Sequence, residues 1–225
     1  MPDKPSTRRS ISRKIIKCIE TDALAYFAKS IGSHDWGHVE RVRGLALHIA
    51  ECEGADLAVV EVAALLHDVA REEEQKARGR ICHAERSATI SARILKKYAV
   101  SDAVADNVIH SVLTHRFRNN HEPATIEARV LYDADKLDSI GAVGLGRDFL
   151  FAGEIGARLY NDPKCDIHAT KQYSTEDTAY REYMVKLRHI KDRMLTREGR
   201  RMAHGRHRFM VRFFERFWAE VEGKV

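Results

Sequence analysis

Two ionisable residues, His67 and Asp68, interrupt one of the most apolar stretches of the chain, AALLHDVA at 63–70. A helix that is hydrophobic on nearly every face lies inside a protein, so ionisable residues at its end must be paired, hydrogen-bonded or bound to a metal. A neutral imidazole beside a carboxylate suits a divalent cation. The dipeptide alone is equally consistent with a structural His-Asp pair, so its interpretation depends on the rest of the sequence.

A second histidine, His38, lies on an apolar stripe. Apolar residues follow it at i+4, i+7 and i+11, which is the spacing of one helix face. We therefore expect His38 to point into the core, where it can act as a ligand. His34 lies one turn earlier, but Gly37 interrupts the helical pattern there, so His34 is the weaker candidate.

Three acids, Asp133, Asp135 and Asp138, fall within six residues of a helix predicted from Thr125 to Ser139. Acids this close would repel one another if they were buried without a cation. Asp133 can be explained as a surface residue and Asp138 as a hydrogen-bonding residue near the helix end. Asp135 lies in the middle of the apolar stripe, where neither explanation applies.

Two further histidines fall on inward faces of predicted helices. His83 opens a helix of about 83–98, with small or apolar residues at i+4, i+7 and i+11, and His115 shares a face with Val104, Val108 and Ser111. A single histidine of this kind is more often a hydrogen-bonded core residue than a ligand. Several that converge favour a shared site.

The composition is that of a folded, helix-rich protein: 44% of the 225 residues are hydrophobic and 32% are charged. The 38 Lys and Arg against 33 Asp and Glu give a net charge of +5, which favours anionic partners such as phosphates without requiring nucleic acid. The four cysteines form no CxxC pair, which indicates reduced thiols. Neither a membrane-spanning run nor a signal peptide is recognisable, so we expect a cytoplasmic protein without a membrane partner.

Helical periodicity covers most of the chain, and no alternating strand pattern occurs, so the predicted class is all-α. We expect residues 1–12 to form a mobile basic tail and 13–225 a single domain, with a core at about 25–150 and C-terminal helices at 176–222 packed on it. The predicted helices span about 13–27, 38–53, 57–71, 83–98, 102–115, 125–139, 176–194 and 199–222. We predict a solvated loop for the charged run at 71–80. A Gly-rich loop that leads into a helix is predicted for residues 140–159, and an exposed insertion or lid for residues 160–175. The basic outer face of the last helix is interpreted as solvated surface, with nucleic acid an unlikely partner.

Together, His38, His67-Asp68 and Asp135 form an H…HD…D series on separate predicted helices. The segments around them read HDWGHVERV (34–42), ALLHDVARE (64–72), CHAERSATISARIL (82–95) and LYDADKLDSIGAVG (131–144). In these segments, and over about residues 25–220, the chain resembles the HD superfamily of metal-dependent phosphohydrolases, in particular its small bacterial members. The resemblance implies an all-helical HD-type bundle and metal-ligand roles for His38, His67, Asp68 and Asp135.

Two imidazoles and two carboxylates suit one divalent ion, such as Mn²⁺, Mg²⁺, Zn²⁺, Ni²⁺ or Fe²⁺, with positions left open for water and a phosphate oxygen. In binuclear HD relatives, histidines on the intervening helices help to hold a second metal. His83 and His115 could do so here, or they could line the pocket and bind substrate. The candidates for proton transfer are Glu72, His34 and Asp138, and those for holding phosphate oxygens are Arg71, Lys136 and Arg147.

The leading functional hypothesis is hydrolysis of a small phosphorylated metabolite, with a nucleoside mono- or triphosphate as the first candidate. A second hypothesis keeps the fold but uses a di-iron site to activate oxygen. A third is a non-catalytic module that senses nucleotide. The complete set of predicted metal ligands in this sequence argues against that hypothesis. The sequence leaves the oligomeric state open, with a homodimer as one option.

Overall fold

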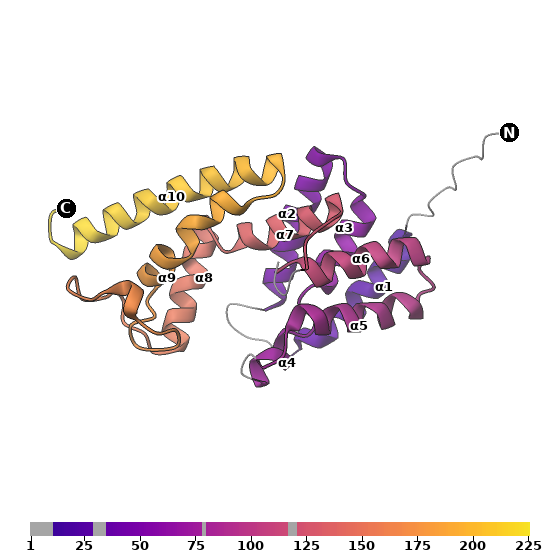
Figure 1. Cartoon of the computed structure of the whole chain (residues 1–225), viewed down its shortest axis with the longest axis horizontal. Helices are drawn as coiled ribbons and strands as arrows, with labels where there is room; N and C mark the ends of the chain where they lie inside the picture. The colour runs from indigo at the N-terminus through magenta and orange to yellow at the C-terminus, as the bar shows by residue number, and fades with distance from the viewer. Residues whose placement is uncertain (1–10, 29–34, 78–79, 117–120) are drawn as a thin grey trace. The chain divides into compact units, whose positions relative to one another are not determined.

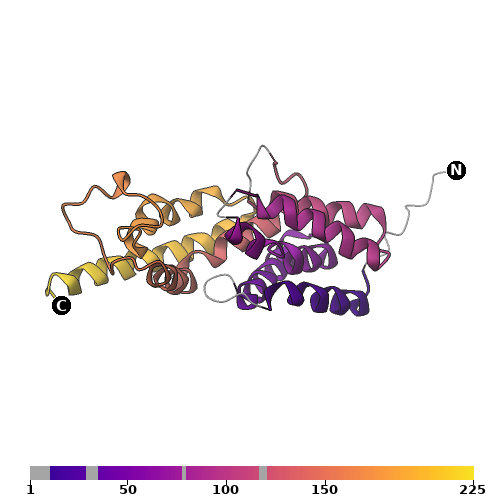
Figure 2. The ribbon, with the colours of Figure 1, turned by 90° about the horizontal axis from the view of Figure 1, so that it is seen from below.

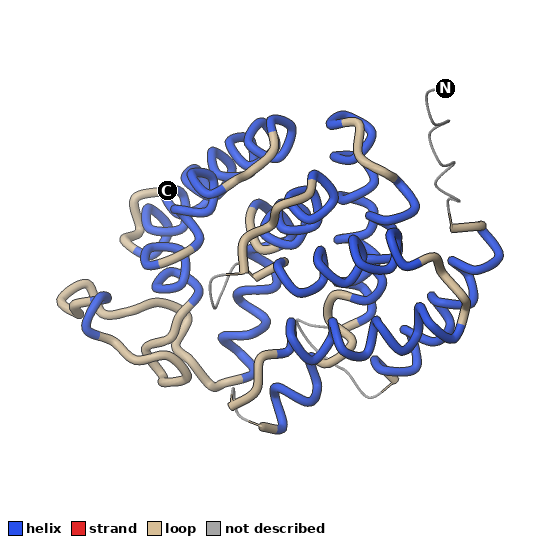
Figure 3. Tube along the Cα trace, turned by 45° about the vertical axis from the view of Figure 1, so that its right-hand side comes forward, coloured by secondary structure: helices blue, strands red, loops and turns tan. Residues whose placement is uncertain are grey.

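The computed structural model describes residues 11–28, 35–77, 80–116 and 121–225. Over these ranges it contains helices, turns and loops and no strand, which confirms the all-α class (Figure 3). None of the helices in these ranges combines the length and apolarity needed to cross a bilayer. The α-helices are α1 (Arg13–Leu24), α2 (Trp36–Glu53), α3 (Leu57–Leu66), α4 (Arg71–Lys76), α5 (His83–Lys97), α6 (Asp102–Thr114), α7 (Ile126–Asp138), α8 (Gly141–Glu154), α9 (Ala179–Val185) and α10 (Arg197–Val221), and the 3₁₀ turns are η1 (Ala25–Phe27), η3 (Ile167–Ala169) and η4 (Leu187–Arg193) (Figure 1).

The chain forms two compact units, each built from two separated parts of the sequence. The first unit consists of Met1–Ser30 and Ala46–Tyr132, and the second of Ile31–Leu45 and Asp133–Val225. The boundaries fall inside helices α2 and α7. His67 and Asp68 therefore belong to the first unit, and His38 and Asp135 to the second. That 13–225 act as one domain stays a prediction.

The core of the first unit is organised around α3. This helix is buried from Val59 to Leu66, because its residues are apolar on nearly every face, and it packs against α1, α5 and α6. Asp56 caps its N-terminus by accepting hydrogen bonds from the backbone N–H groups of Ala58 and Val59. Helices α5 and α6 lie side by side in both views (Figures 1 and 2). A fixed, central α3 holds the residue after its last turn, His67, in the interior.

In the second unit α10 packs against α8 and η4, and aromatic side chains of α9 and α10 pack against one another. Tyr183 stacks on Phe214 with ring centroids 4.5 Å apart, and Tyr180 contacts Trp218 edge to face at 5.1 Å. At the start of α10, the buried carboxylate of Asp133 accepts hydrogen bonds from the backbone N–H groups of Leu195 and Thr196. Asp133 is thus a buried cap and not the surface residue considered from the sequence.

Gly199 in the first turn of α10 leaves room for the Asp133 cap. A Cβ atom at Gly199 would overlap Asp133 Oδ2 and lie 2.7 Å from Thr196 Oγ1, and the hydrogen bonds to Asp133 prevent its carboxylate from moving away. We expect Gly199→Ala to lower the free energy of unfolding by about 1–3 kcal/mol, as substitutions that overpack a site do.

The matched control is Gly205→Ala on the same helix, where a Cβ atom meets nothing within 4 Å. This control should raise stability by up to about 1 kcal/mol through helix propensity. Denaturant unfolding of both variants checks the pair, and equal effects would contradict this account of the cap.

Asp148 on α8 is an acid whose burial is poorly compensated. Its Oδ2 atom is buried and has no hydrogen-bond partner in the described part of the chain. Burial raises the pKa of Asp148 to about 8, with Glu182 and Asp177 adding to the rise while Lys186 and Arg147 oppose it. The carboxyl group is therefore largely protonated at neutral pH.

A raised pKa in the folded state makes the stability contribution of Asp148 fall as pH rises from about 4 to 8. We expect Asp148→Asn to remove this loss, so that the variant is more stable than the parent protein by about 1–3 kcal/mol at pH 9, with a smaller difference at pH 6. Urea unfolding at both pH values measures the difference. If the difference in the free energy of unfolding between Asp148→Asn and the parent protein were the same at pH 6 and at pH 9, Asp148 would not titrate in this range.

Several predicted helix boundaries are wrong. The helix predicted over 57–71 ends at Leu66, and the charged run at 71–80, predicted as a loop, begins with helix α4. The Gly-rich segment after residue 140 is helical from Gly141 onwards, and the long helix predicted over 176–194 is divided into α9 and η4. Of the predicted tail, residues 1–10 lie outside the described part, but Ile11 is buried and Ser12 caps α1.

The segment 160–175, predicted as an exposed insertion or lid, is mostly exposed and contains one 3₁₀ turn. Buried polar side chains nevertheless fix its two ends. Asn161 accepts a hydrogen bond from Thr178 at 2.6 Å, and Arg181 donates to Thr170 O at 3.1 Å and to Asp177 at 2.7 Å. These contacts tie the segment to the start of α9.

Candidate active site

Two buried histidines in the first unit are oriented by the same device. His67 directly follows α3, and its Nδ1 lies 2.7 Å from the carbonyl oxygen of Ala64; His115 directly follows α6, and its Nδ1 lies 2.7 Å from the carbonyl oxygen of Val112. A carbonyl can only accept, so each Nδ1 carries the proton. In each neutral ring the Nε2 lone pair is thus available to a ligand.

The side chains of Asp68, His83 and His115 converge in the interior of the first unit. Asp68 Oδ1 lies 2.9 Å from His83 Nε2 and 3.6 Å from His115 Nε2, and the two Nε2 atoms are 3.1 Å apart. His115 Nε2 and the carboxylate are both acceptors, so a hydrogen-bond donor or a cation is needed among them. A proton on His83 Nε2 can be that donor, and two imidazoles with a carboxylate also fit a divalent ion.

Charges around this cluster keep its carboxylates ionised. Burial raises the pKa of Asp68, but the neighbouring His67 and His83 lower it well below its usual value. Burial likewise raises the pKa of Glu74, and His83 with the guanidinium groups of Arg71 and Arg116 brings it down to about 2. Burial lowers the pKa of His83, but Asp68 beside it raises it overall.

Glu74 connects His83 to two arginines. Glu74 Oε2 lies 2.7 Å from His83 Nδ1 and 2.6 Å from Arg71 Nη1, and Glu74 Oε1 accepts from Arg116 Nη1 at 2.7 Å. The guanidinium nitrogens of Arg71 and Arg116 also lie 3.0 and 3.1 Å from His83 Nδ1. The first unit thus places two guanidinium groups beside the buried Asp68 cluster.

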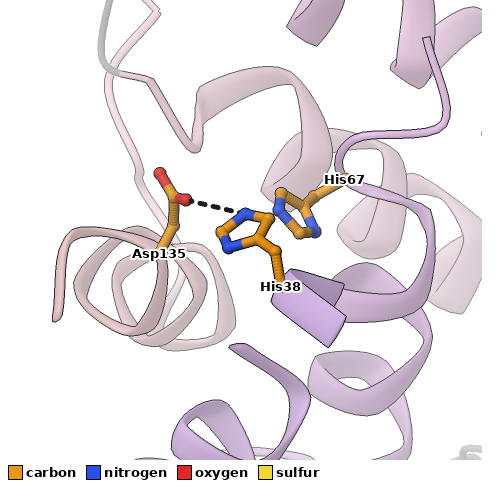
Figure 4. A group of neighbouring side chains, drawn as sticks. All are labelled: His38, His67 and Asp135. Atoms are coloured by element: carbon orange, nitrogen blue, oxygen red, sulfur yellow. Dashed lines mark ion pairs between the residues drawn. The ribbon is translucent and has the colours of Figure 1, made fainter. Parts of the chain in front are cut away.

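In the second unit, the buried His38 faces Asp135 (Figure 4). His38 Nδ1 lies 2.8 Å from the carboxylate of Asp138, so this nitrogen carries the proton and donates it. His38 Nε2 then presents its lone pair 3.5 Å from Asp135 Oδ1. Two acceptors that face each other in this way favour a cation between or beside them, so this pair also fits a metal ion.

Asp138 is held by two arginines as well as by His38. It accepts from Arg41 Nε at 2.8 Å and from Arg147 Nη1 at 2.6 Å, and it is 1% exposed. Burial raises the pKa of Asp138, but the hydrogen bonds from His38 and Arg41 lower it far below its usual value. Asp138 therefore stays a carboxylate that fixes the His38 tautomer and ring orientation.

Comparisons with known proteins identify the family of this chain. The model of the HD domain family matches residues 35–140. The uncharacterized Bacillus subtilis protein YpgQ is 36% identical over 215 residues, which cover 91% of this chain and 93% of YpgQ. The chain belongs to the HD-domain phosphohydrolase family.

Solved structures of HD-domain relatives share the fold. The structure of Bacillus subtilis YpgQ in complex with ADP has a TM-score of 0.72 at 33% identity, covering 92% of this chain and 98% of that one. An HD-superfamily hydrolase from Bacillus thuringiensis has a TM-score of 0.72 at 28% identity, covering 93% of this chain and 98% of that one. As a member of the HD-domain family, this chain is a metal-dependent hydrolase.

Lys136 and Glu72, two more residues predicted for the HD-domain site, each form an ion pair, but only that of Lys136 is with a predicted metal ligand. Lys136 Nζ lies 2.7 Å from Asp135 Oδ2, next to a predicted ligand. Glu72 forms an ion pair with Lys76 at 2.6 Å on α4. His34, the other candidate for proton transfer, lies outside the described residues.

Three residues near the HD-domain histidines were missed in the sequence: Arg41, Glu74 and Arg116. Arg41 follows His38 by three positions and Glu74 follows Arg71 by three, so each lies on the same helix face as a residue already singled out. That spacing was the available signal. Arg116 directly follows His115, and no spacing pattern indicated a role for it.

Proposed function

We propose that this protein hydrolyses a phosphorus–oxygen bond of a nucleotide. The observation that carries the proposal is the ADP complex of YpgQ, because YpgQ is similar to nearly the whole of this chain. Arg71 and Arg116 support it, since guanidinium groups beside the Asp68 cluster suit the phosphates of such a substrate.

We further propose that His38, His67, Asp68 and Asp135 hold one divalent ion. Family membership and the sequence series support this ligand set, and so do the tautomers, because hydrogen bonds at Nδ1 leave Nε2 of both histidines to the metal. A bound divalent ion supplies an activated water and offsets negative charge on a phosphate oxygen.

Other side chains would bind phosphate, transfer a proton or position the metal ligands. Arg71 and Lys136 orient phosphate oxygens, and Glu72 remains the candidate for proton transfer. Asp138 acts as a positioning residue, because its contacts with His38 and two arginines leave it ionised and enclosed. The ion pair of Arg147 with Asp138 suits the same positioning role better than direct contact with phosphate.

We expect one metal equivalent per chain, because two guanidinium groups already supply positive charge at His83. His115→Ala should therefore retain one equivalent of Mn²⁺ in protein purified without oxygen, while its KM for substrate rises. Inductively coupled plasma mass spectrometry after dialysis measures the metal. Two equivalents in the parent protein, with one lost in His115→Ala, would instead establish a binuclear centre.

A substrate panel tests the proposed function. Nucleoside mono-, di- and triphosphates would be incubated with Mn²⁺, Mg²⁺, Zn²⁺, Ni²⁺ or Fe²⁺, and release of phosphate and of pyrophosphate would be measured separately. Turnover of a nucleotide with at least one metal is expected, and the released product identifies the bond that is cleaved. Turnover that requires iron and oxygen but no phosphate ester would contradict the proposal, and so would the absence of turnover with every metal.

A further inference from the structure

Positive charge is concentrated in one segment of the second unit, residues 186–216, far along the sequence from the proposed metal ligands. Residues 186–216 hold eleven Lys and Arg against three Asp and Glu, whereas the whole chain has a net charge of only +5. The rest of the chain is therefore slightly acidic. Most of this basic segment lies on α10, the longest helix of the described residues (Figures 1 and 2).

Five basic residues of α10 form one line along the helix, which we call the α10 basic stripe. They are spaced at i, i+4, i+7, i+11 and i+15, so they fall within an arc of about 80° around the helix axis. All five are exposed, and the stripe runs for about 22 Å. The stripe consists of Arg197, Arg201, His204, Arg208 and Arg212.

The stripe is not neutralised by acids of its own unit. Arg197, Arg208 and Arg212 form no hydrogen bond or ion pair with the described residues, and only Arg201 is paired, with Glu198. Arginines on a solvated helix are commonly balanced by acids one turn away. Here three of the four stripe arginines have no acidic partner among the described residues.

From this row of charges we propose, in place of the solvated surface expected from the sequence, that the α10 basic stripe binds the phosphodiester backbone of a nucleic acid. Successive stripe residues lie one helical turn apart, which presents repeated guanidinium groups to a chain of repeated phosphates. Phe209, 41% exposed, borders the stripe and offers a ring on which a base can stack. The stripe contains none of the proposed metal ligands, so this binding would use other residues.

An anionic membrane suits the stripe less well. A helix that binds a lipid surface places its apolar face among the acyl chains. The buried apolar residues of α10, Ala203, Met210 and Phe214, are at most 3% exposed, because they pack inside the second unit. The exposed large apolar residues of α10, Phe209 and Val221, lie twelve positions apart. The stripe can therefore offer charge to a lipid headgroup but no continuous apolar face to the bilayer.

Fluorescence anisotropy with labelled 20-nucleotide RNA, single-stranded DNA and duplex DNA tests the proposal, with EDTA present to prevent hydrolysis. The test variant is Arg197→Gln, Arg208→Gln and Arg212→Gln combined. The control combines Lys14→Gln, Lys17→Gln and Arg93→Gln, which removes the same three charges from exposed positions of the first unit. We expect the test variant to bind at least about tenfold more weakly at 50 mM salt and its slope of log K against log salt to be shallower by about 2. The control should stay within about threefold of the parent protein.

A third variant, Arg197→Lys, Arg208→Lys and Arg212→Lys combined, separates charge from folding. It should retain the salt slope, and circular dichroism should show all variants equally helical. Equal losses in the stripe variant and the control, or no binding of any nucleic acid by the parent protein, would overturn the proposal. Equally tight binding of poly-glutamate or of phosphatidylglycerol vesicles would overturn it too, since the stripe would then recognise negative charge in general.

Discussion

His67→Ala is expected to lower kcat/KM for the nucleotide substrate by at least about 10³-fold. The reason is that the hydrogen bond from His67 Nδ1 to Ala64 leaves Nε2 unprotonated, and alanine removes this ligand atom from the buried Asp68 neighbourhood. Loss of a metal ligand costs several kcal/mol of transition-state stabilisation, which corresponds to this rate factor. Steady-state kinetics over a range of Mn²⁺ concentrations measures the effect.

The matched control is His110→Ala, at a histidine of the same unit whose Nε2 accepts a hydrogen bond from the backbone of Ala124. Its kcat/KM should stay within about twofold of the parent value. Thermal unfolding gives a readout independent of activity, because a ligand that binds only the folded state raises the melting temperature. Mn²⁺ should raise the melting temperature of the parent protein and of His110→Ala but not that of His67→Ala. Normal turnover by His67→Ala would exclude His67 from the ligand set.

Asp138→Ala is expected to cost about 2–5 kcal/mol of stability and to weaken Mn²⁺ binding about 10–100-fold. Truncation leaves the partly buried Arg147 side chain and the buried His38 Nδ1 without their carboxylate, and removing one partner of a largely buried ion pair is strongly destabilising. Mutation of a residue that orients a metal ligand typically lowers the metal affinity by this factor. Denaturant unfolding and isothermal titration with Mn²⁺ measure the two effects.

Asp138→Asn distinguishes positioning from proton transfer. The amide oxygen can still accept from His38 Nδ1, so we expect kcat to recover at saturating Mn²⁺ and both limbs of the pH–rate profile to remain. Asp192→Asn is the control, because Asp192 is an exposed acid paired with the adjacent Lys191. If one limb of the profile disappeared in Asp138→Asn alone, Asp138 would be an acid or base in the reaction.

Much of the helical architecture could be predicted because local signals agree with the final packing. The capping residue Asp56 and the continuous apolar run after it indicate a buried helix at α3, and the structure has one. The inward direction expected for His38 and His115 is confirmed by their burial, since a polar residue on an apolar stripe shares the environment of its neighbours.

The remaining features depend on contacts that the sequence pattern does not contain. The sequence pattern gave Asp133 a surface role, whereas its burial results from the backbone of Thr196, which lies more than sixty residues away in the chain. Helix α8 begins at Gly141, where a left-handed backbone (φ 81°) allows the turn from α7, so glycines that suggested a loop instead start a helix. The contacts of Asp138 with Arg41 and Arg147 likewise depend on long-range packing and on neighbouring turns.

The most direct test of the proposed metal centre is an anomalous difference map from crystals soaked with Mn²⁺ and a non-hydrolysable nucleotide. We predict one peak, at about 2.0–2.3 Å from Nε2 of His38 and His67 and from carboxylate oxygens of Asp68 and Asp135, with a phosphate oxygen of the nucleotide next to it. A peak bound only by Asp68, His83 and His115, or a nucleotide bound without metal near His38 and Asp135, would contradict the account.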